Sequence, residues 1–254
     1  MISDFYTFKN LKKYNTIMHA VTKKVDKENY LFSLALHTGE KESEIIENRF
    51  KLSKILTKDK KLNFIVAKQT HSDHIEVLKS NQSKGWNSLD SAIENCDALI
   101  TNLKDVALTV LTADCVPILL YDRKKEVIAV VHAGWRGTKE QILAKTIEKM
   151  FKEFGSLAKD IVAGIAPSIG ACCYEVGDDV AKHFSNIQRA YIQKNDKYML
   201  DLPTINKKQL LSSGVKEENI EMSNICTACN VTSFFSYRKE AGCSGRFMSI
   251  IAMI

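Results

Sequence analysis

The sequence predicts an α+β fold in which mixed β-sheets pack in layers and are flanked by helices. Short apolar runs rich in β-branched residues recur along the chain and are bounded by turn residues, as is typical of strands. Segments with helical spacing of apolar residues lie among them, but strands and helices do not alternate strictly. The 254 residues, 45% of them hydrophobic, can build a full core, and no repeat or linker divides them. We therefore expect one domain spanning residues 1–254.

Nine segments are predicted to be strands. Residues 106–111, 117–121 and 127–131 follow one another closely and are short, apolar and bounded by turns. The remaining predicted strands are residues 14–21, 30–36, 62–68, 75–78, 161–165 and 246–254. The polar stretch 80–95 is predicted to form one long loop, and the sequence leaves open whether this loop is a lid.

Four segments are predicted to be helices: residues 42–56, 138–154, 178–184 and 202–211. The first is expected to turn Ile45, Phe50, Leu52 and Ile55 toward the core. The last follows Asp201, a typical N-cap residue, and carries a proline in its first turn.

Residues 138–154 give the clearest helical pattern, because five apolar residues repeat at helical spacing. Thr138 with Gln141 forms a capping-box pattern at the start. Gly155 follows the predicted end, where glycine commonly stops a helix.

Charge and composition limit the partners. The formal net charge is +6, and the excess is an N-terminal lysine surplus spread as single residues and pairs. Nucleic-acid binders usually cluster such charges among aromatic residues, so we expect no nucleic-acid partner. No run of 18 apolar residues and no secretory leader are visible, so we expect no membrane association. An odd number of cysteines, seven, favours a reducing cytoplasm over a disulfide framework. We expect a monomer or homodimer acting on small molecules.

The hairpin predicted between residues 117 and 131 would bring a cysteine and a histidine close together. The turn 122–126 joins the strands 117–121 and 127–131, and a loop centred on Arg123 and Lys124 pairs residues whose numbers sum to 247. Cys115 would then face His132, with Cβ atoms about 4.5–5.5 Å apart. That distance lets a thiolate and an imidazole share one zinc ion. A third ligand is needed, for which His71 is the best candidate by position and His74 its rival.

Several motifs on these segments resemble those of the bacterial laccase-domain family, also called polyphenol oxidase-like or multifunctional purine nucleoside phosphorylase. The motifs are Glu47-Asn-Arg49, Gln69-Thr-His71, Thr112-Ala-Asp-Cys115-Val-Pro117, His132-Ala-Gly-Trp-Arg-Gly-Thr138, Ile169-Gly-Ala-Cys-Cys-Tyr-Glu-Val176, Phe235-Ser-Tyr-Arg238 and Gly245-Arg246. The resemblance covers nearly the whole chain. Ser72 stands where the family has glycine, and Ala171 stands where proline is usual.

The resemblance implies that His71, Cys115 and His132 are zinc ligands. It also implies phosphorolysis of adenosine, inosine, guanosine and methylthioadenosine, together with deamination of adenosine. Phosphate binding needs cations, for which arginine is well suited. The arginines in matched motifs are Arg49, Arg136, Arg238 and Arg246, with Arg136 also a catalytic candidate. Proton transfer to a leaving nitrogen needs a carboxylate, for which Asp114 and Glu175 are the candidates.

Three alternatives stay open at this point. The two histidines and one cysteine could bind copper, as the laccase label suggests, although six histidines without a His-x-His pair are few for a multicopper oxidase. Cys115 could instead be a nucleophile with His132 as its base in a hydrolase, and the resemblance to the family implies peptidoglycan precursors as its substrates. The pair Cys226 and Cys229 could belong to a structural zinc site.

The partners that could complete such a structural site are Cys172, Cys173 and Cys243. The sequence equally allows Cys226 and Cys229 to be buried thiols without a metal.

Overall fold

The computed structural model describes residues 4–57, 61–242 and 245–254. The strands are β1 Ile17–Val21, β2 Asn63–Ile65, β3 Ile75–Val77, β4 Ala98–Thr101, β5 Val106–Thr112, β6 Val116–Asp122, β7 Val127–Ala133, β8 Ile161–Ile165, β9 Glu175–Val176, β10 Tyr191–Lys194, β11 Lys197–Leu200, β12 Ile220–Met222 and β13 Phe247–Met253. The α-helices are α1 Glu42–Thr57, α2 Trp135–Lys139, α3 Ile142–Phe154, α4 Asp178–Ala181 and α5 Leu202–Ser212.

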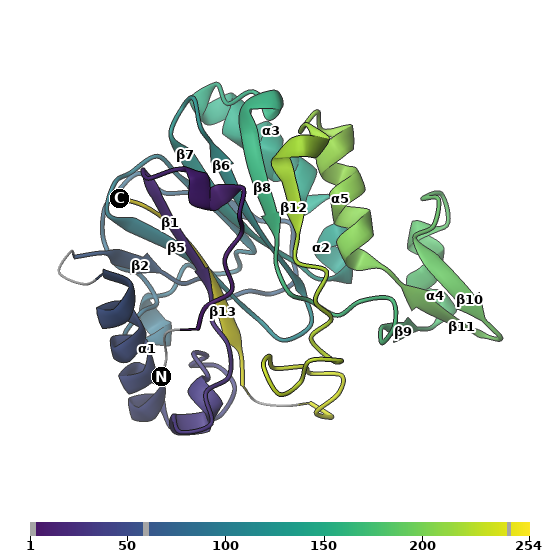
Figure 1. Ribbon diagram of the computed structural model, residues 1–254, viewed down its shortest axis with the longest axis horizontal. Helices are drawn as coiled ribbons and strands as arrows, with labels where there is room; N and C mark the ends of the chain where they lie inside the picture. The colour runs from purple at the N-terminus through teal and green to yellow at the C-terminus, as the bar shows by residue number, and fades with distance from the viewer. Residues whose placement is uncertain (1–3, 58–60, 243–244) are drawn as a thin grey trace.

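Two sheets pack face to face at the centre of the molecule (Figure 1). A four-stranded sheet has the order β1-β13-β5-β2, and a six-stranded sheet has the order β12-β8-β6-β7-β4-β3. Helices α3 and α5 cover the outer face of the six-stranded sheet, and α1 covers the outer face of the other. The predicted layered α+β fold is confirmed. No helix in the described ranges is long and apolar enough to cross a bilayer.

Strands β6 and β7 are buried on both faces, which explains their unbroken apolar sequences. Ile118 and Leu120 pack under the helices, whereas Leu119 and Tyr121 point into the core between the two sheets. Because side chains alternate along a strand, one apolar run supplies both cores.

The hairpin of β6 and β7 has a different register from the predicted one. Pro117 pairs with His132 and Val116 with Ala133, so paired residue numbers sum to 249 rather than 247. A shift of two residues keeps each side chain on its predicted face. Cys115 therefore lies diagonally across from His132 on the same face. The two side chains still meet, although the predicted register was wrong.

Residues 30–36 do not form the predicted strand. Tyr30 and Leu31 lie in a short 3-10 segment, η2 (Asn29–Phe32), with left-handed φ angles of 48° and 54° that no strand accommodates. Leu34 and Ala35 are buried without regular structure against the four-stranded sheet. The apolar pattern indicated burial correctly and strand pairing wrongly.

Helix α1 forms as predicted, but Phe50 and Ile55 point outward, with 55% and 36% of their surfaces exposed. Ile45 and Leu52 are buried as expected. Asn48 and Arg49 occupy the remainder of the buried face because their side chains bind backbone carbonyls there.

The predicted helix 138–154 is two helices. Gln141 takes a left-handed φ of 60°, which breaks α2 from α3 and rules out the capping box. Thr138 lies inside α2 and its hydroxyl accepts a hydrogen bond from Asn206 on α5. Gly155 ends α3 in the left-handed conformation, as predicted, and α5 begins after Asp201, whose side chain accepts from the Thr204 amide.

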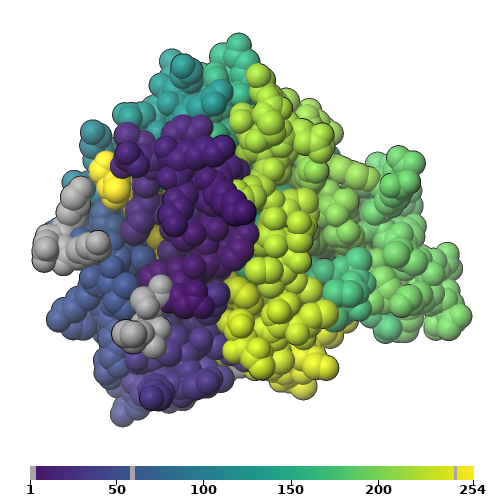
Figure 2. Space-filling view, in the orientation of Figure 1, coloured from purple at the N-terminus to yellow at the C-terminus, as the bar shows by residue number. Residues whose placement is uncertain are grey.

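Five strands were not predicted, because they are very short, lack the apolar pattern of the others or closely follow the long loop. These are β4, β9, β10, β11 and β12. Strands β9 to β11 form a small separate sheet that projects beside α4 (Figures 1 and 2). The loop 80–95 is bound to the four-stranded sheet through the bridges Ile65–Lys84 and Ala67–Ile93.

Candidate metal centre

Three side chains with metal-binding atoms meet where three segments converge. Cys115 lies in the turn between β5 and β6, His132 near the end of β7, and His71 in the loop after β2. Their ligand atoms lie within 4.8 Å of one another, and 3.7 Å separates Cys115 Sγ from His71 Nε2. The spacing allows all three to bind one metal ion. His74 is exposed beside Glu76 and does not belong to this group.

The buried carboxylate of Asp97 organises two of the three ligands. Its Oδ1 lies 2.7 Å from Nδ1 of His132 and accepts the His71 amide at 3.1 Å. Its Oδ2 accepts the amide and the hydroxyl of Ser72, both at 2.7 Å. A carboxylate on Nδ1 fixes the tautomer that leaves Nε2 of His132 available to a metal. Asp97 immediately precedes β4, and its side chain is 1% exposed.

The backbone around His71 is held in an uncommon conformation. His71 itself has a φ of 61°, whereas Ser72, at the position where the resemblance expects glycine, is not left-handed. Gln69 anchors the start of this loop by pairing both of its amide atoms with the backbone of Leu111, each at 2.8 Å. The left-handed turn therefore falls on the ligand, and Ser72 serves as a donor to Asp97.

Gly134 is required because a side chain would not fit there, and not because of its backbone conformation. Its φ of −72° suits any residue. A Cβ there would lie 2.8 Å from Cδ2 of His71 and 3.2 Å from Sγ of Cys115. The chain passes too close to His71 and Cys115 for any side chain at this position.

The electrostatics favour a thiolate at Cys115 paired with a protonated imidazole at His132, whose Nε2 proton a metal ion would have to displace. Burial raises the pKa of the Cys115 thiol, but the charges and hydrogen bonds of His132 and His71 outweigh it and lower the pKa. Burial lowers the pKa of His132, and Cys115 and Asp97 reverse this and raise it. Burial also raises the pKa of Asp97, but its hydrogen bonds to His132 and Ser72 bring it down to about 2. The group resembles the donor sets that hold zinc in catalytic sites, with two histidines, one thiolate and a carboxylate behind them.

The three ligands lie at the side of a pocket of about 470 Å³, a size typical of small-molecule sites. Three arginines line it, each over an aromatic ring. The guanidinium of Arg136 lies 4.4 Å from the ring centre of Trp135. The corresponding distances are 5.3 Å for Arg238 over Tyr174 and 5.8 Å for Arg246 over Tyr237. The pocket thus combines cations with flat apolar surfaces.

Arg49 was predicted to bind phosphate, and the structure contradicts this. Its side chain is 1% exposed and donates to the carbonyls of Leu34, Gly85 and Trp86 at 2.6–2.9 Å. Burial, the largest effect, lowers its pKa to about 10. Arg49 fastens the loop 80–95 to α1, and no described residue of that loop lines the pocket.

The two candidate acid–base carboxylates lie in different surroundings. Asp114 borders the pocket, but its oxygens accept from the Thr227 hydroxyl at 2.6 Å and from the Arg238 amide at 2.7 Å. Glu175 is exposed and outside the pocket lining, and its backbone carbonyl accepts from the Arg238 guanidinium at 2.7 Å. Both residues therefore position Arg238.

Several residues of this site were not predicted from the sequence. His37 lines the pocket; burial lowers its pKa, and the neighbouring Arg246 and Arg49 lower it further. Tyr174 and Tyr237 lie inside quoted motifs but had no assigned role. Asp97 could have been suspected only as an isolated acid before the apolar run of β4.

Comparison with known proteins places the chain among relatives of similar length. It is 34% identical over 224 residues to purine nucleoside phosphorylase YlmD of Bacillus subtilis strain 168, covering 86% of this chain and 80% of the relative. It is 37% identical over 194 residues to adenosine deaminase RL5 of an unknown prokaryotic organism, covering 72% of each chain.

A solved structure, the hypothetical protein YfiH of Bacillus licheniformis, superimposes with a TM-score of 0.89 at 32% identity. The superposition covers 96% of this chain and 95% of that one. The family described as multi-copper polyphenol oxidoreductase laccase matches residues 19–254. The chain therefore belongs to this family.

Proposed function

We propose that this protein is a zinc-dependent purine nucleoside phosphorylase that also deaminates adenosine. The substrates would be adenosine, inosine, guanosine and methylthioadenosine, which phosphate converts to the free base and a pentose 1-phosphate. The observation that carries the proposal is the placement of three arginines and three aromatic rings around a pocket bordered by His71, Cys115 and His132. The names of the relatives support it, because they include both activities.

Different residues of the pocket would bind the phosphate and the purine. Arg238 and Arg136 would hold phosphate, because a planar guanidinium binds oxyanions with two parallel hydrogen bonds. Arg246 lies on the same pocket and would contribute to the same charge. Trp135 and the two tyrosines offer faces on which a purine can stack. Asp114 would act by fixing the Arg238 backbone, at the distances given above.

The ligand set fits zinc in a site of the catalytic kind, in which His71, Cys115 and His132 would hold the ion and leave one position for water or substrate. When bound, zinc supplies a Lewis acid beside the substrate. His37 is the imidazole in the pocket lining besides the two ligands, and its lowered pKa keeps it neutral near pH 7. We assign to it the transfer of a proton to or from the purine.

The test is a product analysis. Purified protein is incubated with inosine and adenosine, with and without phosphate, and the products are separated by chromatography. We expect hypoxanthine or adenine with ribose 1-phosphate only when phosphate is present, and inosine from adenosine without it. Cys115→Ala should abolish both activities, whereas Cys96→Ala, a buried thiol outside the site, should keep them. A zinc-loaded protein that converts neither nucleoside would refute the assignment.

A metal-free Cys/His hydrolase, acting on amides such as peptidoglycan precursors, is the second candidate. The lowered pKa of Cys115 beside His132 favours it, since this is how thiol nucleophiles are activated. Loss of activity on chelation supports the zinc enzyme. Loss on alkylation of Cys115, with full activity after the metal is removed, supports the hydrolase.

Copper is the third candidate, suggested by the name of the family. Six histidines and no His-x-His pair leave few ligands for several copper ions. Metal analysis of the purified protein separates the two ions, and oxidation of phenols by a copper-loaded sample would favour the oxidase.

A further inference from the structure

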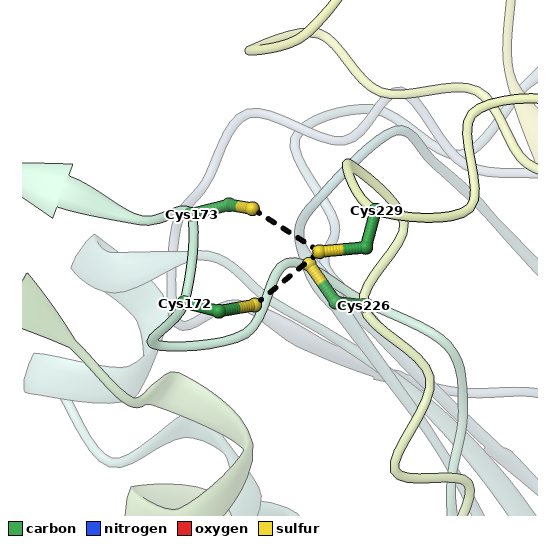
Figure 3. Close-up of side chains that lie close together, drawn as sticks. All are labelled: Cys172, Cys173, Cys226 and Cys229. Carbon is green, nitrogen blue, oxygen red and sulfur yellow. Dashed lines mark hydrogen bonds between the residues drawn. The ribbon is translucent and has the colours of Figure 1, made fainter.

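A second cluster of metal-binding side chains lies outside the His71–Cys115–His132 centre and outside its pocket. It consists of Cys172, Cys173, Cys226 and Cys229, whose sulfur atoms lie within 4.8 Å of one another. Figure 3 shows the four side chains pointing toward a common centre, two from the turn before β9 and two from the segment after β12. The nucleoside chemistry proposed above uses none of them.

The distances suit one tetrahedral ion. Sγ of Cys229 lies 3.6 Å from Sγ of Cys172 and 3.4 Å from Sγ of Cys173. Thiolates about 2.3 Å from a tetrahedral zinc are separated by about 3.8 Å. The sulfurs of a disulfide lie only about 2.05 Å apart. In iron–sulfur clusters the thiolates bind different irons and are held apart by the cluster. Four sulfurs this close together fit a single ion.

The backbone brings the two cysteine pairs together without help from the sulfurs. Ser168 pairs with Cys226 as a parallel bridge, with hydrogen bonds of 3.2 Å from its amide to Ile225 and 3.1 Å from the Thr227 amide to its carbonyl. Asn230 closes the Cys226–Cys229 turn by donating its amide and its side chain to the Cys226 carbonyl. The two turns are therefore fixed by ordinary hydrogen bonds, so the ligand set is preorganised.

A further contact favours a thiolate at one of the four positions. The Gly170 amide points at Sγ of Cys226 at 3.3 Å. An N–H group directed at a ligand sulfur stabilises the thiolate that a metal requires, as outer hydrogen bonds do in metal sites generally. Cys172 and Cys229 are exposed, so an ion can enter from solvent.

We propose that Cys172, Cys173, Cys226 and Cys229 bind one zinc ion in a closed structural site. Four protein ligands leave no open position, so this ion takes no part in chemistry. Cys243, the other ligand candidate named from the sequence, lies outside the described residues, and the set is complete without it.

The zinc ion on the four cysteines would hold in place two segments that line the pocket beside His71, Cys115 and His132. Tyr174 directly follows Cys173 and lies under Arg238. Thr227, inside the Cys226–Cys229 turn, donates to Asp114, the neighbour of Cys115. A zinc ion on the four sulfurs thereby ties the segment that carries Tyr174 to the turn that carries Cys115. The inference does not depend on which substrate the pocket takes.

The first test counts metal ions. Protein produced with added zinc and purified under reducing conditions is analysed for zinc per chain. We expect two ions in the wild type, one in Cys229→Ser, one in Cys115→Ala and two in the control Cys96→Ala. Equal zinc content in Cys229→Ser and the wild type would overturn the proposal, as would one ion in the wild type that Cys115→Ala removes.

The second test uses the wild-type protein, so it does not depend on a variant that folds. After exchange into ¹¹³Cd, we expect one NMR signal in the far-downfield region of tetrathiolate cadmium and a second, upfield signal from the mixed nitrogen and sulfur centre. The exposed thiols of Cys172 and Cys229 should resist a thiol reagent until a strong chelator is added. Rapid labelling in zinc-loaded protein, a disulfide among the four cysteines after reducing purification, or iron in place of zinc would each contradict the assignment.

Discussion

Replacement of Asp97 by asparagine tests whether a buried carboxylate builds the metal centre. The wild-type oxygens accept from Nδ1 of His132, from the backbone amides of Thr70, His71 and Ser72, and from the Ser72 hydroxyl. Asparagine supplies one oxygen and one NH₂ group. In either orientation the NH₂ group faces at least one buried donor that the carboxylate had accepted.

The cost follows from these contacts. Breaking a buried charged pair costs about 3–5 kcal/mol in the free energy of unfolding. Loss of the carboxylate behind a ligating histidine weakens metal binding by about 10–100-fold. In Asp97→Asn, we expect both effects, because Asp97 holds the imidazole of His132 and the backbone of His71.

Two measurements separate the effects. Zinc affinity is measured by competition with a chelating dye, and unfolding by urea is followed in metal-free protein. The matched control is Asp73→Asn, which removes an exposed carboxylate two residues from His71 that pairs only at the surface with Lys145. The control should change stability by less than about 1 kcal/mol and leave zinc affinity intact. A zinc affinity of Asp97→Asn within twofold of the wild type would show that the Asp97 carboxylate does not support metal binding.

Three further predictions concern Gly134, the pair Arg49 and Arg238, and His19. Gly134→Ala should weaken zinc binding by roughly tenfold or more, because its Cβ would displace the His71 ring, and a crystal structure with that ring unmoved would contradict this. Arg49→Lys should lower the free energy of unfolding by about 3 kcal/mol and leave the KM for phosphate unchanged. Arg238→Lys should raise that KM at least about tenfold. Steady-state kinetics in which Arg49→Lys raised the KM for phosphate and Arg238→Lys did not would argue against both assignments. Burial lowers the pKa of His19 to about 4. Between pH 6.5 and pH 4 the unfolded chain therefore binds a proton at His19 that the folded chain does not bind. The free energy of unfolding should fall by up to about 3 kcal/mol as the pH falls from 6.5 to 4. Urea titrations in chelator should show a shallower fall for His19→Gln, and an equally steep one would exclude His19 as the cause.

The part of the site that could be predicted depends on local and periodic signals. The turn after β6 and the alternation of side chains place Cys115 and His132 on one face, and this conclusion tolerates an error of two residues in the register. The third candidate, His71, comes from a segment far away in sequence; its position favoured it over His74, and the resemblance to a family then selected it.

The errors have a common physical origin, since hydrophobicity indicates burial but not the conformation that achieves it. Residues 30–36 are buried as an irregular segment, and Gln141 breaks a continuous helical pattern with one left-handed residue. Arg49 shows the reverse case, in which a charged residue is buried because three carbonyls accept its hydrogen bonds. Its motif indicated importance, and only the three-dimensional contacts distinguish a structural role from phosphate binding.

Asp97 marks the limit of reasoning from a single sequence, whereas the four cysteines could be named from the sequence but not chosen among the possible partners. Each ligand of the first centre lies in a motif, but the carboxylate that orients two of them lies 26 positions after His71 and 35 before His132, so no local spacing connects the three. Cys172 and Cys173 are likewise separated from Cys229 by more than fifty residues, and the parallel pairing of β12 with β8, continued by the bridge between Ser168 and Cys226, brings them together. In both cases the chemistry depends on strand order rather than on sequence spacing. A residue-by-residue transfer from a motif therefore names candidate ligand atoms and misses the residues that hold these atoms in place.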